Sequence, residues 1–293
     1  MICLLSIIML ISILLIDSNM RIATTEYILR YPNLPDSFDG FRIAVLADVH
    51  DAEFGKENKR LIAQVQKANP NIIVIAGDLV NAYPNHRSAE QQHKAVETLM
   101  TGLAPIAPVY FITGNHEGVE MLGWPDTLLP ILEKCGAKAL LNECIAIESG
   151  GESIILAGTD DLQRSVDITK PSEYLQEIIK SERDSFVVVL DHRNNYLPFY
   201  SELGVDLVLS GHSHGGVVRL PFTDGLIGQD REWFPTYTNG VYTIENTNML
   251  VSRGIGNPTG YPRFLNNPHI AVAVLKCSST TSPTTDKPFF ICP

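Results

Sequence analysis

The stretch Gly211-His212-Ser213-His214-Gly215-Gly216 places two imidazoles one residue apart on a loop bordered by glycines. An apolar run at residues 205–209 precedes it and predicts a buried strand that ends where the histidines begin. Imidazole nitrogens on such a loop are typical of a metal site, and Ser213 lets the two rings point in different directions. The alternative is a turn that holds two histidines without a ligand, because H-x-H is a short pattern. The other strand ends decide between these interpretations.

Four earlier apolar runs also end in polar side chains of the same chemical type. These strand ends carry Asp48 and His50, then Asp78, then Asn115 with His116, then His192. Ligands of open α/β sheets bind beyond the carboxyl ends of the strands, so we expect these side chains to meet at one edge. Each has a local alternative, such as a turn cap, but five strand ends that share this chemistry favour a metal centre.

Apolar runs alternate with helical patterns between residues 41 and 277, and this rhythm predicts an α/β fold in a single domain. Strands that are apolar along their whole length indicate sheets covered on both faces. The expected strands are residues 21–31, 41–47, 71–76, 108–113, 145–147, 153–158, 186–190 and 205–209, and the expected helices are residues 57–68, 88–103, 125–134, 172–180 and 195–203. Short strands are expected near residues 217–220, 240–244, 249–252 and 270–275.

The polar groups at the strand ends are two aspartates, one asparagine and five histidines, which is the ligand chemistry of Mn, Fe or Zn. Seven ligands are too many for one ion and suit two ions about 3.5–4 Å apart that share a carboxylate. Such a pair would supply a bridging hydroxide as the nucleophile and neutralise charge on phosphate oxygens. The eighth group would then be free to protonate the leaving oxygen as a general acid.

The order of these motifs resembles the calcineurin-like metallophosphoesterase superfamily, whose pattern is D-x-H, G-D, G-N-H-[DE], H and G-H-x-H. The matching residues are Asp48-Val49-His50, Gly77-Asp78, Gly114-Asn115-His116-Glu117, His192 and Gly211-His212-Ser213-His214. The resemblance covers about residues 41–277 and implies a four-layer α-β-β-α sandwich with two mixed sheets and a metal site at the carboxyl ends of the strands.

The resemblance also implies a role for each residue. Asp48, His50 and His214 would bind the first ion, Asn115, His192 and His212 would bind the second, and Asp78 would bridge both. His116 would be the uncoordinated acid near the leaving group, and Glu117 would orient that histidine. Manganese is the expected metal, with iron and zinc as alternatives.

A narrower resemblance is to the bacterial membrane-anchored branch of the superfamily. It rests on Val218-Arg219-Leu220-Pro221, on the segment from Val251 to Gly256, on Pro262-Arg263-Phe264 and on Asn267-Pro268. The branch implies a phosphorylated small-molecule or lipid-linked substrate, for example of the UDP-2,3-diacylglucosamine type, or a phosphodiesterase or phosphatase associated with the cell wall. Departures beside the motifs, at His269 and at Arg193-Asn194-Asn195, put the substrate in doubt but leave the metal site intact.

Arg219, Arg253 and Arg263 are candidate contacts for a phosphate or headgroup, because guanidinium matches phosphate geometry. Structural ion pairing within an acidic protein is the alternative for all three. A catalytically silent scaffold and a mononuclear zinc hydrolase are the alternatives for the whole chain, although a silent relative would be expected to have lost ligands.

Residues 2–16 are almost wholly apolar, so we expect residues 1–20 to form an uncleaved membrane anchor. A signal peptide is disfavoured, because the segment has neither a basic n-region nor a small-residue cleavage site. Arg21 and Arg30 follow the segment, which favours a cytoplasmic domain, while an anchored domain on the other side stays open.

The remaining features set broader limits. The formal net charge of −11 argues against a nucleic-acid partner. The five cysteines lack C-x-x-C spacing, and Cys135 and Cys144 could pair or stay reduced. The domain is expected to span residues 21–277, and the Ser/Thr/Pro-rich residues 278–293 to form a flexible tail. The oligomeric state has no signal in the sequence.

Overall fold

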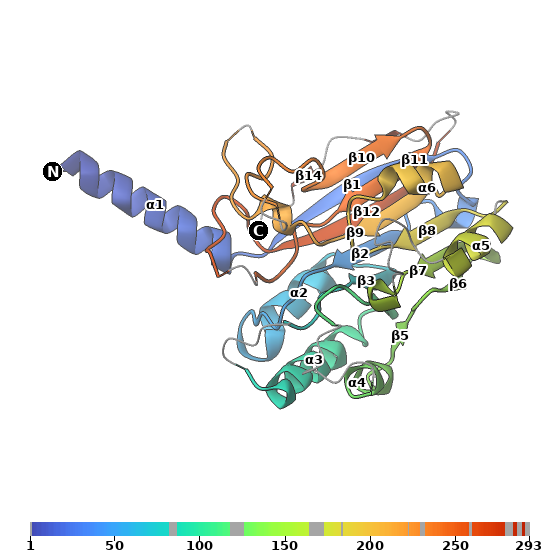
Figure 1. Ribbon diagram of the computed structural model, residues 1–293, viewed down its shortest axis with the longest axis horizontal. Coiled ribbons are helices and arrows are strands. Elements are labelled where there is room, and N and C mark those ends of the chain that lie inside the picture. The colour runs from blue at the N-terminus through green and yellow to red at the C-terminus, as the bar shows by residue number, and fades with distance from the viewer. Residues whose placement is uncertain are drawn as a thin grey trace.

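The computed structural model contains two mixed sheets packed face to face between two layers of helices, with one further helix projecting away from them (Figure 1). The structure describes residues 2–81, 87–117, 126–163, 173–182, 184–221, 223–228, 232–257, 260–278, 284–285 and 289–290. This arrangement confirms the predicted four-layer α/β sandwich.

The first sheet, called sheet A, is built around strands from the beginning, middle and end of the chain. Its order is β13-β1-β12-β2-β3-β4-β5, with β14 also paired to β1. The bounds are β1 Ala23–Tyr31, β2 Arg42–Leu46, β3 Ile72–Ala76, β4 Val109–Ile112, β5 Ala137–Ala139, β12 His269–Cys277, β13 Thr284–Thr285 and β14 Phe289–Phe290. β2, β3 and β4 run parallel and adjacent, so their carboxyl ends lie side by side.

The second sheet, called sheet B, has the order β10-β11-β9-β8-β7-β6. The bounds are β6 Glu143–Ser149, β7 Glu152–Gly158, β8 Val187–Leu190, β9 Leu207–Ser210, β10 Gly240–Ile244 and β11 Thr247–Val251. β8 and β9 are parallel neighbours, so their carboxyl ends also meet at one edge.

Alternate residues of one strand enter two different cores, which explains why these strands are apolar throughout. In β2, Ile43 and Val45 pack between the two sheets, whereas Ala44 and Leu46 pack under the outer helices. The outer helices of sheet A are α2 Lys59–Lys67, α3 Ala89–Leu103 and α4 Leu128–Lys134, and those of sheet B are α5 Glu173–Ser181 and α6 Leu197–Leu203.

The helices begin close to their predicted starts, for local reasons that the sequence shows. The Ser88 hydroxyl accepts a hydrogen bond from the Gln91 amide, and the Gln91 side chain accepts one from the Ser88 amide. This capping box satisfies two donors that would otherwise lack partners at the start of α3.

Two details of the expected secondary structure were wrong. Residues 217–220 do not form a strand but make isolated bridges, Val218 with Phe264 and Arg219 with Gly225, because the chain folds back tightly at Gly216. β5 was missed because three residues are too short for a periodic pattern.

The N-terminal apolar segment forms α1, Ile2–Met20, which projects from the domain in Figure 1. It is long and apolar enough to cross a membrane, and only 6% of its most apolar window is buried. Of the predicted tail, Ser278 and the two-residue strands β13 and β14 are described, both strands pairing with β1, and the rest lies outside the described residues. Cys135 and Cys144 are both free thiols.

The layer between the sheets should dominate stability. Leu156 of β7 is fully buried there, so Leu156→Ala should lower the free energy of unfolding by ~2–5 kcal/mol through lost burial and a residual cavity. Glu148→Ala, on the exposed side of β6, is the matched control and should change it by less than ~0.5 kcal/mol. Thermal unfolding of the detergent-solubilised chain measures both, and equal effects would contradict this packing.

Candidate metal centre

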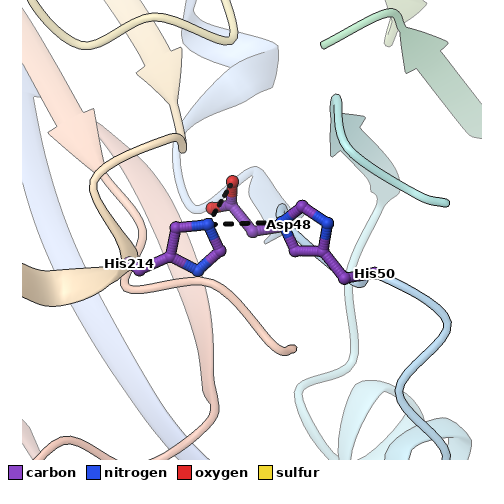
Figure 2. Close-up of side chains that lie close together, drawn as sticks. All are labelled: Asp48, His50 and His214. Carbon is purple, nitrogen blue, oxygen red and sulfur yellow. Dashed lines mark hydrogen bonds and ion pairs between the residues drawn. The ribbon is translucent and has the colours of Figure 1, made fainter. Parts of the chain in front are cut away.

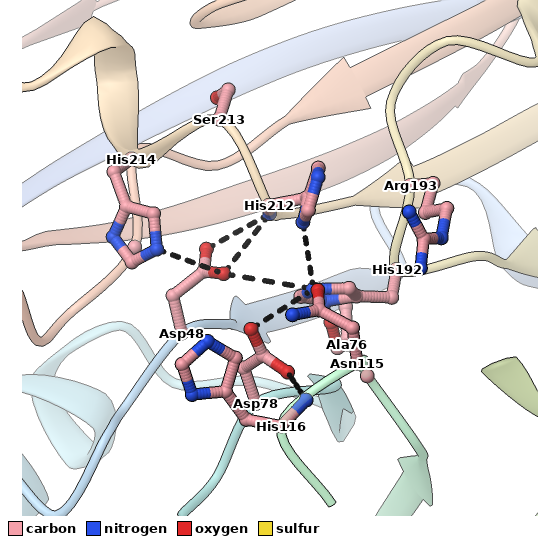
Figure 3. A network of polar contacts seen from close by, with 12 residues as sticks. Asp48, Ala76, Asp78, Asn115, His116, His192, Arg193, His212, Ser213 and His214 are labelled. Carbon is pink, nitrogen blue, oxygen red and sulfur yellow. Dashed lines mark hydrogen bonds and ion pairs between the residues drawn. The ribbon is translucent and has the colours of Figure 1, made fainter. Parts of the chain in front are cut away.

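The polar strand ends predicted from the sequence converge at one edge of the molecule (Figure 3). Sheet A contributes the residues after β2, β3 and β4, and sheet B contributes those after β8 and β9. The site therefore lies across the junction of the two packed sheets, and each strand delivers its side chains through a short loop. The side chains brought together are Asp48, His50, Asp78, Asn115, His116, His192, His212 and His214.

One group of three side chains joins the two sheets through His214, which contacts both Asp48 and His50 (Figure 2). His50 Nε2 lies 3.2 Å from His214 Nε2, and His214 Nε2 lies 3.6 Å from Asp48 Oδ1. All three side chains are buried, and the ligand atoms lie within 4.8 Å of one another. These atoms could hold a single ion.

A second group lies next to it around His192. His192 Nε2 is 3.2 Å from His212 Nδ1 and 3.2 Å from Asn115 Oδ1. The Nδ1 atom of His192 lies 2.8 Å from the Ala76 carbonyl, which fixes the ring and directs Nε2 into the group. His212 and His214 thus enter different groups, as the intervening Ser213 suggested.

Asp78 stands between the two groups. Its Oδ2 atom lies 3.6 Å from His50 Nε2 and 3.1 Å from His192 Nε2, so one carboxylate oxygen faces both. The other oxygen, Oδ1, accepts a hydrogen bond of 2.8 Å from the His116 amide. Oδ2 is buried against these two imidazoles, and its lone pairs could bind a cation that displaced a proton from His192.

Three of the imidazoles are neutral and so have a free lone pair. Burial lowers the pKa of His50 and of His212 to about 3, and lowers that of His214 well below its usual range. For His192, burial is outweighed by the Asp78 carboxylate, which raises the pKa to about 10. A cation at Asp78 would compete with that proton, because metal ligands must be deprotonated.

The buried carboxylates also fit a cationic ligand. Burial, with repulsion from Asp78, raises the pKa of Asp48 to about 7 despite the attraction of His192, and burial and Asp78 raise that of Glu117 to about 7. Several acids buried together are costly unless positive charge compensates them. Nitrogen and oxygen donors with no thiolate suit Mn, Fe or Zn, so the residues present fit two divalent ions.

The loops that carry these side chains have strained backbones. Five of the residues assigned to the ions have positive φ angles, at Asp48, His50, Asp78, His212 and His214. Such conformations are costly for residues other than glycine, and they cluster at functional sites. Gly77 and Gly114 allow the strand ends to meet, since a Cβ atom on Gly114 would lie 2.3 Å from Asp78 Oδ1.

His116 lies beside the first group. Its ring centre is 4.5 Å from that of His50 in an edge-on arrangement, and burial lowers its pKa. Glu117 is buried and makes four contacts with backbone amides: Oε1 accepts from Leu79 and Val80, and Oε2 accepts from Asp78 and Gly114. Glu117 therefore holds the loop that carries Asp78, and its predicted action on the His116 ring stays a prediction.

The three arginines predicted to bind substrate have different surroundings. Arg263 is 1% exposed, and its guanidinium donates to carbonyl oxygens that include those of Arg253 and Gly256, which is a structural role. The Arg219 guanidinium donates to the Gly215 carbonyl and to Asp224. Arg253 has a buried Nε atom without a hydrogen-bond partner, and burial lowers its pKa to about 10.

Some supporting residues were not identified from the sequence. Asn266 donates hydrogen bonds of 2.8 Å to the His214 carbonyl and 3.0 Å to that of Val217, so it fixes the last loop of the site. Arg193 pairs with Asp161 at 2.7 Å beside a cleft of about 320 Å³. That cleft reaches His212 and is also lined by Asn194, Phe234 and Tyr237. The sequence had marked Arg193 and Asn194 only as departures beside a motif, and their contacts, like those of Asn266, appear only in three dimensions.

The fold and the grouped side chains are those of a candidate metal site, and comparison with known proteins gives the family. Residues 41–216, more than half of the chain, match the model of the calcineurin-like phosphoesterases. The chain belongs to the calcineurin-like phosphoesterase family and is a metallophosphoesterase.

Several curated relatives are similar over much of their length. A metallophosphoesterase of Bacillus subtilis, YkuE, is 29% identical over 263 residues, which cover 88% of this chain and 87% of that protein. The phosphodiesterase YaeI of Escherichia coli is 25% identical over a match that covers 77% of this chain and 78% of that protein. A transmembrane protein with a metallophosphoesterase domain from Danio rerio is 28% identical over 62% of this chain, which is 42% of that protein.

Replacing Glu117 tests how the Asp78 loop is held. In Glu117→Gln one oxygen becomes an amino group that faces two backbone N–H groups, and each orphaned amide costs ~1–3 kcal/mol. We expect a lower melting temperature and a lower metal content, although loss of a buried charge offsets part of the cost. Glu133→Gln, on the exposed side of α4, is the control. Unchanged melting and metal content in Glu117→Gln would contradict this role.

Proposed function

We propose that the protein is a dinuclear metal-dependent phosphoesterase that cleaves a phosphate ester or a diphosphate bond. The observation that carries the proposal is the position of Asp78, whose Oδ2 faces an imidazole of each ligand group. A carboxylate between two sets of nitrogen and oxygen donors is the arrangement that two divalent ions require.

The proposed ligand sets follow the two groups. Asp48, His50 and His214 hold one ion, Asn115, His192 and His212 hold the other, and Asp78 is shared. Two divalent ions supply an activated water and neutralise charge on the phosphate oxygens. Manganese is proposed as the metal, with iron and zinc as alternatives, since nitrogen and carboxylate ligands suit all three.

His116 is proposed as the group that gives a proton to the leaving oxygen. Its ring lies next to that of His50. Its backbone amide donates a hydrogen bond to Asp78 Oδ1, which fixes the loop after β4. A ring nitrogen of His116 lies within 4.8 Å of the ligand atoms of His50 and Asp78, and in this proposal it faces the substrate instead of an ion. Glu117 supports the same loop by holding four amides. Asn266 supports the opposite side by holding the His214 carbonyl.

The proposed substrate is a lipid-linked phosphate or a UDP-sugar of the UDP-2,3-diacylglucosamine type. The cleft beside His212 offers Arg193 and two asparagines, and Arg253 has an unpartnered Nε. A phosphodiesterase or phosphatase of the cell wall is the second candidate, which the resemblance to the membrane-anchored branch also supports. A silent scaffold is disfavoured because every motif position still carries a ligand or the acid.

We propose residues 21–277 as the catalytic domain and α1 as its membrane anchor. The transmembrane relative from Danio rerio supports a membrane location. Arg21 and Arg30 after α1 favour the cytoplasmic face.

Hydrolysis of a chromogenic phosphate diester with added Mn²⁺ tests the proposal, together with Asp78→Ala. Removing the shared ligand should abolish hydrolysis and lower the metal content measured by elemental analysis, because both groups lose a donor. Asp39 is an exposed acid that precedes β2, at the end of the strand opposite to Asp48. Asp39→Ala should therefore change neither hydrolysis nor metal content. Absence of turnover by the folded wild-type chain with Mn²⁺, Fe²⁺ and Zn²⁺ would refute the activity.

Replacing His116 tests its role as the acid. His116→Ala should keep its metal but lose about 10²–10⁴-fold in kcat for an alkyl ester, whose leaving group needs a proton. The loss for a nitrophenyl ester should be much smaller, because nitrophenolate leaves without one. Equal losses for the two leaving groups would assign His116 another task.

A further inference from the structure

Among the described residues, the exposed large hydrophobic side chains lie on α1 and on two loops. Outside α1, the large hydrophobic side chains exposed among the described residues are Leu220 at 43%, Trp233 at 67%, Phe234 at 67% and Tyr261 at 74%. We call these four side chains the aromatic rim. Single exposed hydrophobic residues are common on protein surfaces, but a group restricted to neighbouring loops marks an interaction site.

The two loops of the aromatic rim are joined into one surface. The Arg219 amide donates to the Phe264 carbonyl at 2.9 Å, which ties the loop of Leu220 to the loop of Tyr261. The Phe234 amide donates to the Leu226 carbonyl at 3.0 Å, and the Leu226 amide donates to the Val218 carbonyl at 2.8 Å. The rim is therefore held by backbone hydrogen bonds.

The same surface is fixed to the C-terminal end of α1. Asn19 and Arg263 exchange two hydrogen bonds, of 2.9 and 3.0 Å, and Ser18 accepts one of 2.8 Å from the Leu265 amide. Arg60 donates to the last carbonyl of the helix, that of Met20, at 2.8 Å. In Figure 1 the described parts of these loops, at residues 217–221, 223–228, 232–238, 253–257 and 260–268, lie near the point where α1 leaves the domain.

The helix itself has the dimensions of a membrane span. Its 19 residues extend about 28 Å, close to the ~30 Å hydrocarbon core of a bilayer. Most of its long apolar side chains are exposed, and Leu14 and Leu15 near its C-terminal end are half-buried, so the domain covers the helix only at that end. A helix that enters a bilayer from this fixed junction brings the aromatic rim to the lipid surface, where Trp and Tyr side chains are stabilised.

The rim also borders the metal site. Phe234 lines the cleft that reaches His212, and Asn266, three residues from Arg263, holds the His214 carbonyl. Arg263 links the end of α1 to a residue assigned to an ion, because its carbonyl accepts from Asn19 and its guanidinium donates to the His214 carbonyl.

We propose that the aromatic rim rests on the lipid headgroup region of the bilayer that α1 enters, with the metal cleft opening beside it. The inference rests on the proposed anchoring by α1 and does not depend on catalysis. It holds the metal centre at a fixed height above the membrane surface.

The test places one tryptophan at a time in the full-length chain in phosphatidylcholine–phosphatidylglycerol vesicles. The chain has two tryptophans, so Trp124→Phe leaves Trp233 as the only reporter. Adding Trp233→Phe and Tyr261→Trp moves the reporter to the second loop. Adding Trp233→Phe and Lys138→Trp instead moves it to exposed β5, at the far edge of sheet A, as the control.

We expect brominated phosphatidylcholine to reduce the fluorescence of the reporters at positions 233 and 261, and aqueous acrylamide to reduce it little. The control at position 138 should behave in the opposite way. Acrylamide quenching at all three positions without lipid quenching, in chains that resist carbonate extraction, would overturn the rim contact and leave the anchor intact. Protection at 233 and 261 from both quenchers would assign the rim to a second copy or another protein and would also overturn it. Release of the chain by carbonate would refute the anchor, and ester hydrolysis by the same preparation reports separately on the proposed enzyme.

Discussion

The Asp78 carboxylate is the interaction on which the rest of the site depends, because one of its oxygens faces imidazoles from two different sheets. His50 follows β2 of sheet A, and His192 follows β8 of sheet B. The two can meet only if the sheets pack with their carboxyl-terminal edges aligned. The buried layer between the sheets therefore does more than stabilise the fold, since it sets the distance between the two ligand groups.

Holding Asp78 there requires backbone conformations that are costly alone. Asp78 has a positive φ angle, and the neighbouring Gly114 approaches too closely to carry a side chain. Glu117 offsets this cost by accepting hydrogen bonds from four amides of the two loops. The burial that raises the pKa of Glu117 also strengthens these hydrogen bonds, because the local dielectric constant is low.

Strand periodicity and the residue types directly after each strand predicted the α/β class and the gathering of the polar side chains, whereas the four-layer sandwich was implied by the resemblance to the calcineurin-like phosphoesterases. The sequence did not predict Asn266 or the Arg193–Asp161 pair, which reach the site from loops without a motif. It also did not predict that the Arg263 guanidinium donates to carbonyl oxygens of neighbouring loops, because these contacts depend on how distant loops pack. The short strand β5 and the bridges after Gly216 depend on tertiary contacts in the same way.

The surroundings of the metal centre connect it to the proposed anchor, since Arg263 contacts both Asn19 and the loop of His214. The proposed chemistry depends on two ions that share Asp78 at this centre. Electron paramagnetic resonance of the full-length chain loaded with Mn²⁺ tests that claim most directly. The account predicts two ions per chain with the broad spectrum of an exchange-coupled pair. A six-line spectrum of isolated Mn²⁺ at one ion per chain would contradict it.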